Sequence, residues 1–161
     1  MPSKVLVVFY SRSGVTAAVA NIIAKELGAD IERIMDKKNR EGLIGILRTG
    51  KDVFLHHLSE IESPAKDPSQ YDVVIIGTPV WAGTMSLPVK AYITRMKHKF
   101  GKIAFFCTGG GFGAKNTIKD MSYLCGRQPI AVMCISHMSY FTGGYKKSIA
   151  KFVEDIRKQN P

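Results

Sequence analysis

The sequence predicts an α/β fold in which a doubly wound parallel sheet carries helices on both of its faces. Strand-like segments alternate with segments of helical periodicity five times along the chain. Residues 4–10 carry an unbroken hydrophobic run from Val5 to Tyr10, which is typical of a parallel strand buried on both faces, and the apolar run in residues 71–77 predicts a second deeply buried strand. The 161 residues suit a single domain, residues 1–161, that is large enough for a proper hydrophobic core.

The composition is that of an ordinary globular protein, with 45% hydrophobic and 22% charged residues. No apolar run approaches the roughly 20 residues that cross a bilayer, and the N-terminus lacks the layout of a signal peptide. The four histidines show no ligand spacing with carboxylates or cysteines, so we expect no metal. The three cysteines have no C-x-x-C spacing, and we expect reduced thiols in a cytoplasmic protein, at Cys107, Cys125 and Cys134.

The formal net charge is +10, because 23 Lys and Arg residues outnumber 13 Asp and Glu residues. Basic residues cluster at positions 37–40, 95–102 and 146–158. Such charge can steer nucleic acid, an anionic membrane or an acidic protein toward the surface, but solvated surface side chains give the same pattern. No nucleic-acid-binding motif accompanies the charge, so nucleic acid is disfavoured as a partner. Electrostatic steering of an acidic protein partner remains open.

The first strand is expected at residues 4–10 and the first helix at residues 15–27. Apolar side chains recur in this helix at the i, i+3, i+4, i+7 spacing of an amphipathic helix, and Gly28 follows as a stop signal. A short second strand is expected at residues 29–34. Residues 35–71 are too many for one loop in a compact domain, and their apolar residues suffice for one or two helices.

The third strand, residues 71–77, is expected to end in a loop at residues 78–84. Ser86 and Pro88 then predict the start of a helix, since proline is tolerated in a first turn, and Gly101 ends it. A strand, a glycine-rich loop, a helix, a strand and a last helix follow, at residues 102–108, 109–113, 115–125, 130–136 and 148–158.

A hexapeptide rich in hydroxyl side chains, residues 11–16, joins the first strand to the first helix. A strand that turns directly into a helix presents unpaired backbone N–H groups at the positive end of the helix dipole, which favours a phosphate. The loop has neither the lysine of a P-loop nor the three glycines of a dinucleotide fingerprint. A bound monophosphate is therefore the better fit, with an ordinary serine-rich turn as the alternative.

Two further loops follow the third and fourth strands. Residues 78–84 contain the only tryptophan, Trp81, whose ring can stack on a flat ligand or pack in the core. The glycine loop at residues 109–113 is flexible enough to lie against the same ligand. Ligands of doubly wound sheets bind beyond the C-terminal ends of the strands, where we expect all three loops to meet.

Together these loops resemble those of the flavodoxin family, and the resemblance covers essentially the whole chain. It implies the strand order 2-1-3-4-5 and FMN as a non-covalent cofactor. The residues implied to hold the FMN phosphate are Ser11, Arg12, Ser13, Gly14, Val15 and Thr16. One side of the isoalloxazine would be lined by Thr78, Pro79, Val80, Trp81, Ala82 and Gly83. The other side would be lined by Cys107, Thr108, Gly109, Gly110, Gly111 and Phe112.

The resemblance implies an electron-transfer protein that shuttles electrons between redox protein partners. The chain departs from typical flavodoxins because it is basic, and because Phe112 is the only nearby substitute for the tyrosine that often covers the flavin. A NAD(P)H-dependent reductase of quinones or other small acceptors is the alternative on the same fold. A non-catalytic domain without flavin is a third reading. Cys107 is expected near the ring, either as a redox thiol or as a small buried hydrophobe.

Overall fold

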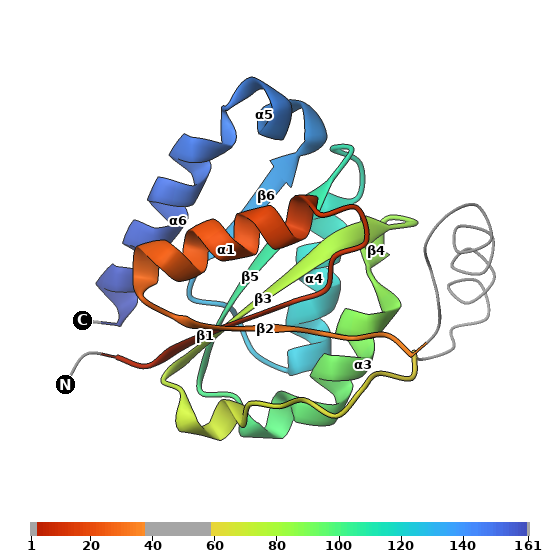
Figure 1. Cartoon of the computed structure of the whole chain (residues 1–161), viewed down its shortest axis with the longest axis vertical. Helices are drawn as coiled ribbons and strands as arrows, with labels where there is room; N and C mark the ends of the chain where they lie inside the picture. The colour runs from red at the N-terminus through yellow and green to blue at the C-terminus, as the bar shows by residue number, and fades with distance from the viewer. Residues whose placement is uncertain (1–2, 38–58, 161) are drawn as a thin grey trace.

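The structure, a computed structural model, describes residues 3–37 and 59–160, which form a parallel sheet between two layers of helices (Figure 1). The parallel strands lie in the spatial order β2-β1-β3-β5-β6, and a short strand, β4, pairs antiparallel with the end of β3. The expected order 2-1-3-4-5 is therefore confirmed, with β4 as an addition. The strands are β1 (Val5–Phe9), β2 (Asp30–Arg33), β3 (Val73–Trp81), β4 (Thr84–Met85), β5 (Lys102–Gly109) and β6 (Val132–Ser136).

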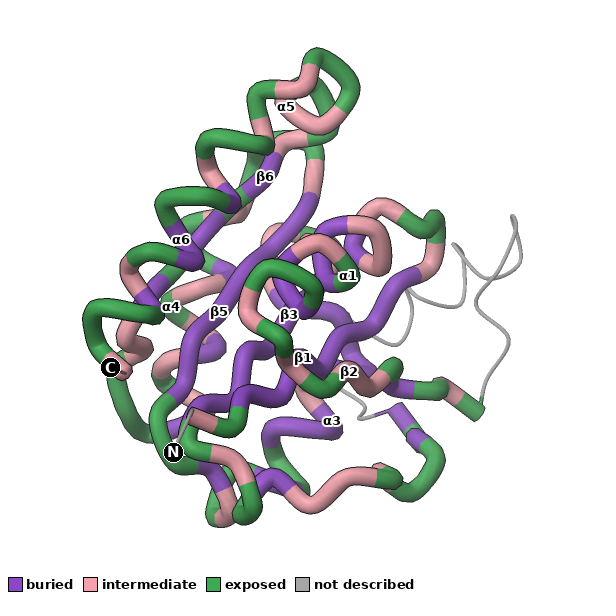
Figure 2. The backbone as a smooth tube through the Cα atoms, turned by 60° about the vertical axis from the view of Figure 1, so that its left-hand side comes forward, coloured by how far each residue is buried: buried purple, intermediate pink, exposed green. Residues whose placement is uncertain are grey.

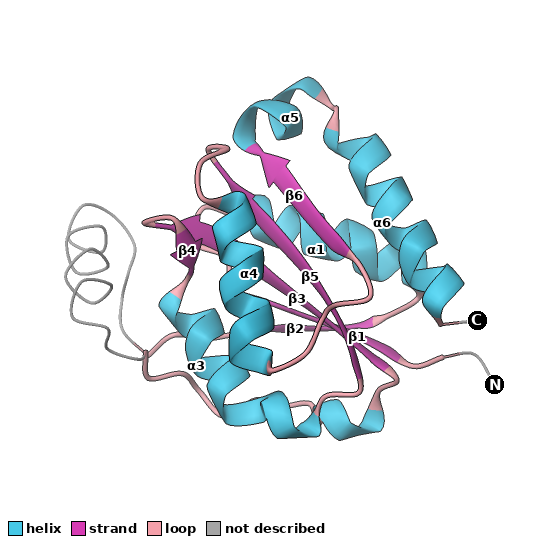
Figure 3. Cartoon of the chain, turned by 180° about the vertical axis from the view of Figure 1, so that it is seen from behind, coloured by secondary structure: helices cyan, strands magenta, loops and turns pink. Residues whose placement is uncertain are grey.

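Helices cover both faces of the sheet. One face packs against α1 (Val15–Leu27) and α6 (Tyr145–Gln159), and the other against α3 (Leu87–Met96) and α4 (Ala114–Cys125) (Figure 3). Successive residues of a strand point to opposite faces, so each central strand serves two cores. Val7 faces α1 and α6, for example, whereas Val8 faces α3 and α4. Figure 2 shows the central strands as the continuously buried part of the chain.

The helix boundaries follow the signals in the sequence. Gly28 caps the C-terminus of α1, and Ser86 is the N-cap of α3 with a proline in its first turn. Two short 3₁₀ turns also occur: η1 (Pro68–Gln70) precedes β3, and η2 (Lys97–Lys99) follows α3 directly. The one or two helices expected within residues 35–71 fall on positions 38–58, and these positions lie outside the described residues.

A short helix, α5 (His137–Thr142), was not predicted from the sequence. None of its residues is buried, so it has no apolar stripe that periodicity could detect. The Ser136 hydroxyl caps it by accepting a 3.0 Å hydrogen bond from the Ser139 N–H. Among the described residues, no helix combines the length and the apolar character that crossing a membrane requires.

Candidate functional site

The strands β1, β3 and β5 end side by side at one edge of the sheet, and a loop follows each of them (Figure 1). The register sets Phe9 beside Gly77, and Pro79 beside Thr108. A buried hydrogen bond of 2.8 Å joins the hydroxyls of Thr16 and Thr108, and so ties the start of α1 to the end of β5. The structure therefore brings the three sequence-predicted loops together.

The first loop, residues 11–14, leads from β1 into α1. The buried Ser11 hydroxyl accepts a 3.1 Å hydrogen bond from the Gly14 N–H, which fixes the shape of the loop. Gly14 is the N-cap residue of α1, and no side chain caps the helix there. The first N–H groups of α1 thus stay available to an anion at the positive end of the helix dipole.

Two arginines add positive charge to the first loop. Arg33, at the end of β2, donates a 2.8 Å hydrogen bond to the backbone carbonyl of Ser11, and Arg12 belongs to the loop itself. Residues 11–16 contain no carboxylate. The donor set of uncapped N–H groups, the exposed Ser13 and two guanidinium groups fits a phosphate.

Sequence reasoning missed Arg33, which lies 22 residues from Ser11 along the chain. The signal that could have found it is the strand order. In the order 2-1-3, the end of the second strand lies next to the end of the first, and Arg33 pairs in register with Phe9. A basic residue at that position therefore points to the loop that follows β1.

The expected loop at residues 78–84 is wrong, because β3 continues to Trp81 and the chain turns back at once into β4. Ala82 and Gly83 form the turn, with φ values of 48° and 79°. A two-residue hairpin turn of this kind requires positive φ at both central residues and is usually signalled by Asn-Gly or Asp-Gly. The alanine at the first position removed that signal, and a proline such as Pro79 is rare within a central strand.

Helix α4 holds the tip of this hairpin. Asn116 Nδ2 donates a 3.0 Å hydrogen bond to the Gly83 carbonyl, and the Thr84 hydroxyl donates to the Asp120 carboxylate. At Gly113 the two segments touch, since a Cβ placed there would lie 2.5 Å from Gly83 Cα. Asn116 and Asp120 were also missed from the sequence, because one helical turn separates them and nothing in their spacing indicates a hairpin as their partner.

Trp81 is largely buried, with 7% of its surface exposed. Its ring meets the Tyr10 ring edge to face at 5.4 Å, and the Arg12 guanidinium lies 5.3 Å from the ring centroid, over one face. A flavin that stacked on that face would have to displace Arg12, whose cation–π contact is favourable in itself. Stacking on Trp81 stays a prediction.

The glycine loop, residues 109–113, faces the hairpin. Gly109 approaches β3 so closely that a Cβ there would lie 3.0 Å from Val80 Cβ. Gly110 and Gly111 have open space around them, and the Phe112 side chain is 86% exposed. The loop thus offers an accessible aromatic ring beside the hairpin tip.

Two predicted site residues direct their side chains into the protein. The Thr78 hydroxyl donates to Ser86 Oγ at 3.1 Å and accepts from the Ser86 N–H at 3.0 Å, so it anchors the start of α3. Cys107 is 1% exposed and contacts Cys134. Of the remaining predicted residues, Val15, Pro79, Val80 and Gly83 are half-buried and Ala82 is exposed at the hairpin tip. Their roles in binding stay predictions.

In a comparison with known families, the NADPH-dependent FMN reductase family matches residues 3–137. The chain belongs to this family. A search of curated proteins finds no match. The family match and the arrangement of loops support FMN as the cofactor.

Solved structures with the same fold include other flavoproteins. The flavoprotein from Lactobacillus acidophilus NCFM, in complex with FMN, has a TM-score of 0.73 and 25% identity, covering 82% of this chain and 93% of its own. A flavoprotein from Bacteroides eggerthii has a TM-score of 0.71 and 22% identity, covering 84% and 88%. The WrbA-like flavodoxin from Agrobacterium tumefaciens has a TM-score of 0.60 and 19% identity, covering 99% of both chains. The flavodoxin-like fold is thereby confirmed.

Within the described part of the chain, no group of three or more His, Cys, Asp and Glu side chains is placed to hold a metal ion.

Proposed function

We propose that the protein binds FMN non-covalently at this edge of the sheet, with the phosphate group on the first loop. The observation that carries the proposal is the uncapped N-terminus of α1, with Arg33 beside it and no carboxylate within residues 11–16. The N–H groups of the first turn of α1 would donate to the phosphate oxygens, and the Ser13 hydroxyl would add a neutral donor. The 25% identity to a flavoprotein in complex with FMN supports the same assignment.

The flavin ring would be bordered by the hairpin turn on one side and by the glycine loop on the other. The hairpin turn is held by Asn116, so its backbone is pre-organised for a ring that lies against it. Open space at Gly110 and Gly111 leaves room for the ring, and Phe112 can fold over it. Arg12 would exchange its contact with Trp81 for the phosphate, which would free the tryptophan face.

The activity we propose is that of a reductase that takes electrons from a reduced nicotinamide nucleotide and passes them to a small acceptor such as a quinone. The membership of the NADPH-dependent FMN reductase family supports this reading over a pure electron carrier. Bound FMN would supply the redox chemistry, since it exchanges one or two electrons. The protein residues bind the phosphate, border the ring and set its electrostatic surroundings. The net charge of +10 suits an anionic nucleotide.

The second candidate is a carrier that exchanges electrons with protein partners. The observation in its favour is a set of large apolar side chains exposed at the same edge of the sheet, on the glycine loop and on α5. Phe112 is 86%, Met138 72% and Phe141 78% exposed. Exposed apolar residues near a redox centre favour docking of another protein.

One experiment separates the two activities. The purified protein is saturated with FMN, freed of unbound flavin, and mixed with NADPH in the absence of oxygen while the flavin absorption is followed. A reductase predicts stoichiometric bleaching, and repeated turnover once a quinone is added. Bound flavin that NADPH does not bleach would contradict the reductase and favour the carrier. A protein that retains no flavin would contradict both.

A further inference from the structure

Two cysteines lie side by side on neighbouring strands, outside the contacts proposed for FMN phosphate binding. Cys107 of β5 pairs in register with Cys134 of β6, and the two sulfur atoms are 3.0 Å apart. Adjacent strands are about 4.8 Å apart, which lies within the range of Cα separations that a disulfide spans. Because an S–S bond is about 2.0 Å long, the sulfurs need to approach by only about 1 Å to form one.

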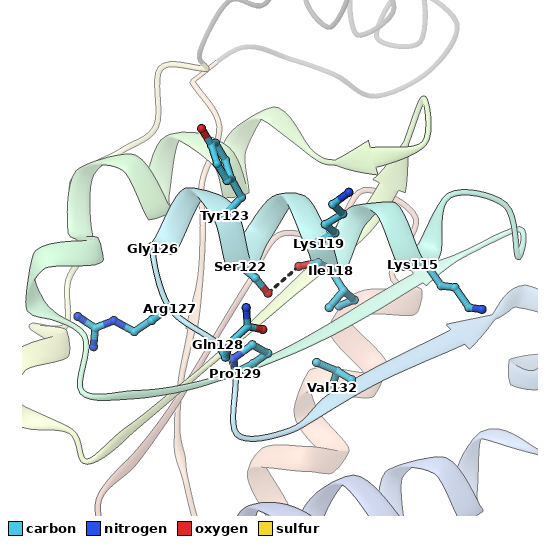
Figure 4. A pocket seen from close by; sticks show the side chains of 10 residues that line it. All are labelled: Lys115, Ile118, Lys119, Ser122, Tyr123, Gly126, Arg127, Gln128, Pro129 and Val132. Atoms are coloured by element: carbon cyan, nitrogen blue, oxygen red, sulfur yellow. Dashed lines mark hydrogen bonds between the residues drawn. The ribbon is translucent and has the colours of Figure 1, made fainter.

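The two thiols differ in their access to solvent. Cys107 is 1% exposed, whereas Cys134 is exposed, because β6 is the edge strand of the sheet. A groove of about 980 Å³ runs between α4 and β6, with Val132 on its β6 side (Figure 4). Val132 is 52% exposed and shares a strand face with Cys134, two residues further on. This face of β6 is therefore open, and a small reagent reaches Cys134 before it reaches Cys107.

The hydrogen bond between the two sulfurs gives them opposite character. The Cys107 S–H donates to Cys134 Sγ, and this bond lowers the pKa of Cys134 against the opposing effect of burial. The same bond and the burial of Cys107 raise the pKa of the Cys107 thiol. Cys134 is thus the thiol that deprotonates more readily to the thiolate, the nucleophilic form of cysteine, while Cys107 holds its proton more tightly.

We propose that Cys134 and Cys107 form a redox-active pair that reduces a small hydroperoxide and closes to a disulfide. The Cys134 thiolate attacks the peroxide, the O–O bond breaks, and sulfur loses two electrons to form a sulfenic acid and, with one proton, an alcohol or water. The Cys107 thiol then attacks this sulfur, the S–O bond breaks, and the hydroxyl group leaves with the Cys107 proton as water. In sum, two thiols and one hydroperoxide give a disulfide, an alcohol or water, and one further water.

The third cysteine is an internal contrast. Cys125 ends α4, is 7% exposed, and has a pKa raised by burial to about 11. The other two cysteines of the chain contact each other on β5 and β6, whereas Cys125 lies at the end of α4. Cys125 is therefore expected to stay reduced where Cys134 reacts, and the contrast does not depend on whether FMN is bound.

Peptide mapping tests the proposal directly. The full-length protein is treated with a slight excess of hydrogen peroxide, its free thiols are blocked with N-ethylmaleimide, and it is digested with trypsin. The sequence places the three cysteines in separate tryptic peptides, residues 103–115, 120–127 and 128–146. We expect peptides 103–115 and 128–146 to be joined, with a mass two hydrogens below their sum, and peptide 120–127 to be labelled in full.

Single variants separate the two roles. Cys107→Ala is expected to stop at the sulfenic acid, which dimedone traps on peptide 128–146, whereas Cys134→Ser leaves Cys107 unreacted. Cys125→Ser, the matched control, is expected to form the disulfide as the unaltered protein does. The proposal is overturned if the unaltered protein carries N-ethylmaleimide on both peptides after peroxide treatment, or if Cys134 is oxidised to the sulfinic acid without joining Cys107.

Discussion

Replacement of Gly113 by alanine tests the contact between the glycine loop and the hairpin. Gly113 has a φ of +80°, and a Cβ there would lie 2.5 Å from the Gly83 backbone. Ordinary contact begins at 3.4 Å, so one of the two segments must retreat by 3.4 minus 2.5, or 0.9 Å. The left-handed backbone costs an alanine about 1–2 kcal/mol, and the crowding about 1–3 kcal/mol.

The expected effect of Gly113→Ala is therefore a loss of about 2–5 kcal/mol in the free energy of unfolding. In a chain of this size it lowers the melting temperature by roughly 4–20 °C. Thermal unfolding followed by circular dichroism measures this loss. The affinity for FMN is expected to fall as well, because the two segments border the proposed site.

Two other glycines of the same loop provide matched controls. Gly111 has a φ of +95° and open space around it, so Gly111→Ala isolates the backbone cost of about 1–2 kcal/mol. Gly110 has open space around it and no positive φ, so Gly110→Ala is expected to have the melting temperature of the unaltered protein. Equal melting temperatures for Gly113→Ala and Gly111→Ala would refute the contact with Gly83. A Gly110→Ala variant as unstable as Gly113→Ala would refute the loop conformation.

Three further substitutions test other contacts. Arg33→Gln removes a cation and the hydrogen bond to the Ser11 carbonyl, so FMN should bind about tenfold more weakly, while the affinity for riboflavin, which has no phosphate, should be unaffected. Fluorescence titration measures both affinities, and equal losses for the two flavins would contradict the role of Arg33. Thr108→Val leaves the buried Thr16 hydroxyl without its partner and should lower the free energy of unfolding in urea by about 1–3 kcal/mol. Thr108→Ser should retain most of that free energy, and a valine variant of full stability would count against this hydrogen bond. Tyr92→Phe removes a buried hydroxyl that has no hydrogen-bond partner among the described residues, so the free energy of unfolding should rise by about 1 kcal/mol. A clear decrease in that free energy would show that the hydroxyl is paired.

The sequence was sufficient to predict the order and type of most elements of the sheet. Apolar runs indicate strands that are buried on both faces, and such runs form all of β1 and the first part of β3. The helix α5 and the strand β4 were not predicted, because they are short and their conformation depends on local geometry. In β4 the decisive feature is positive φ at Ala82, a residue type that rarely adopts it.

The position of the candidate site in the fold was predictable where its residues follow a strand directly, as the first loop does. Its supporting contacts were not, because they join residues far apart in the sequence. The hydrogen bond from Asn116 to Gly83 spans 33 positions, and that between Thr16 and Thr108 spans 92. The position of Arg12 over Trp81 depends on side-chain packing, which no spacing in the sequence encodes.

The central claim is that the first loop recognises a phosphate, and the affinities for FMN and riboflavin test it most directly. Both flavins are titrated with the purified protein while the quenching of their fluorescence is measured. Charge-assisted hydrogen bonds contribute about 1.5–3 kcal/mol each, so two of them would make FMN bind at least about a hundredfold more tightly. Equal affinities for FMN and riboflavin would contradict a phosphate site at the N-terminus of α1, and binding of neither would contradict the proposed cofactor.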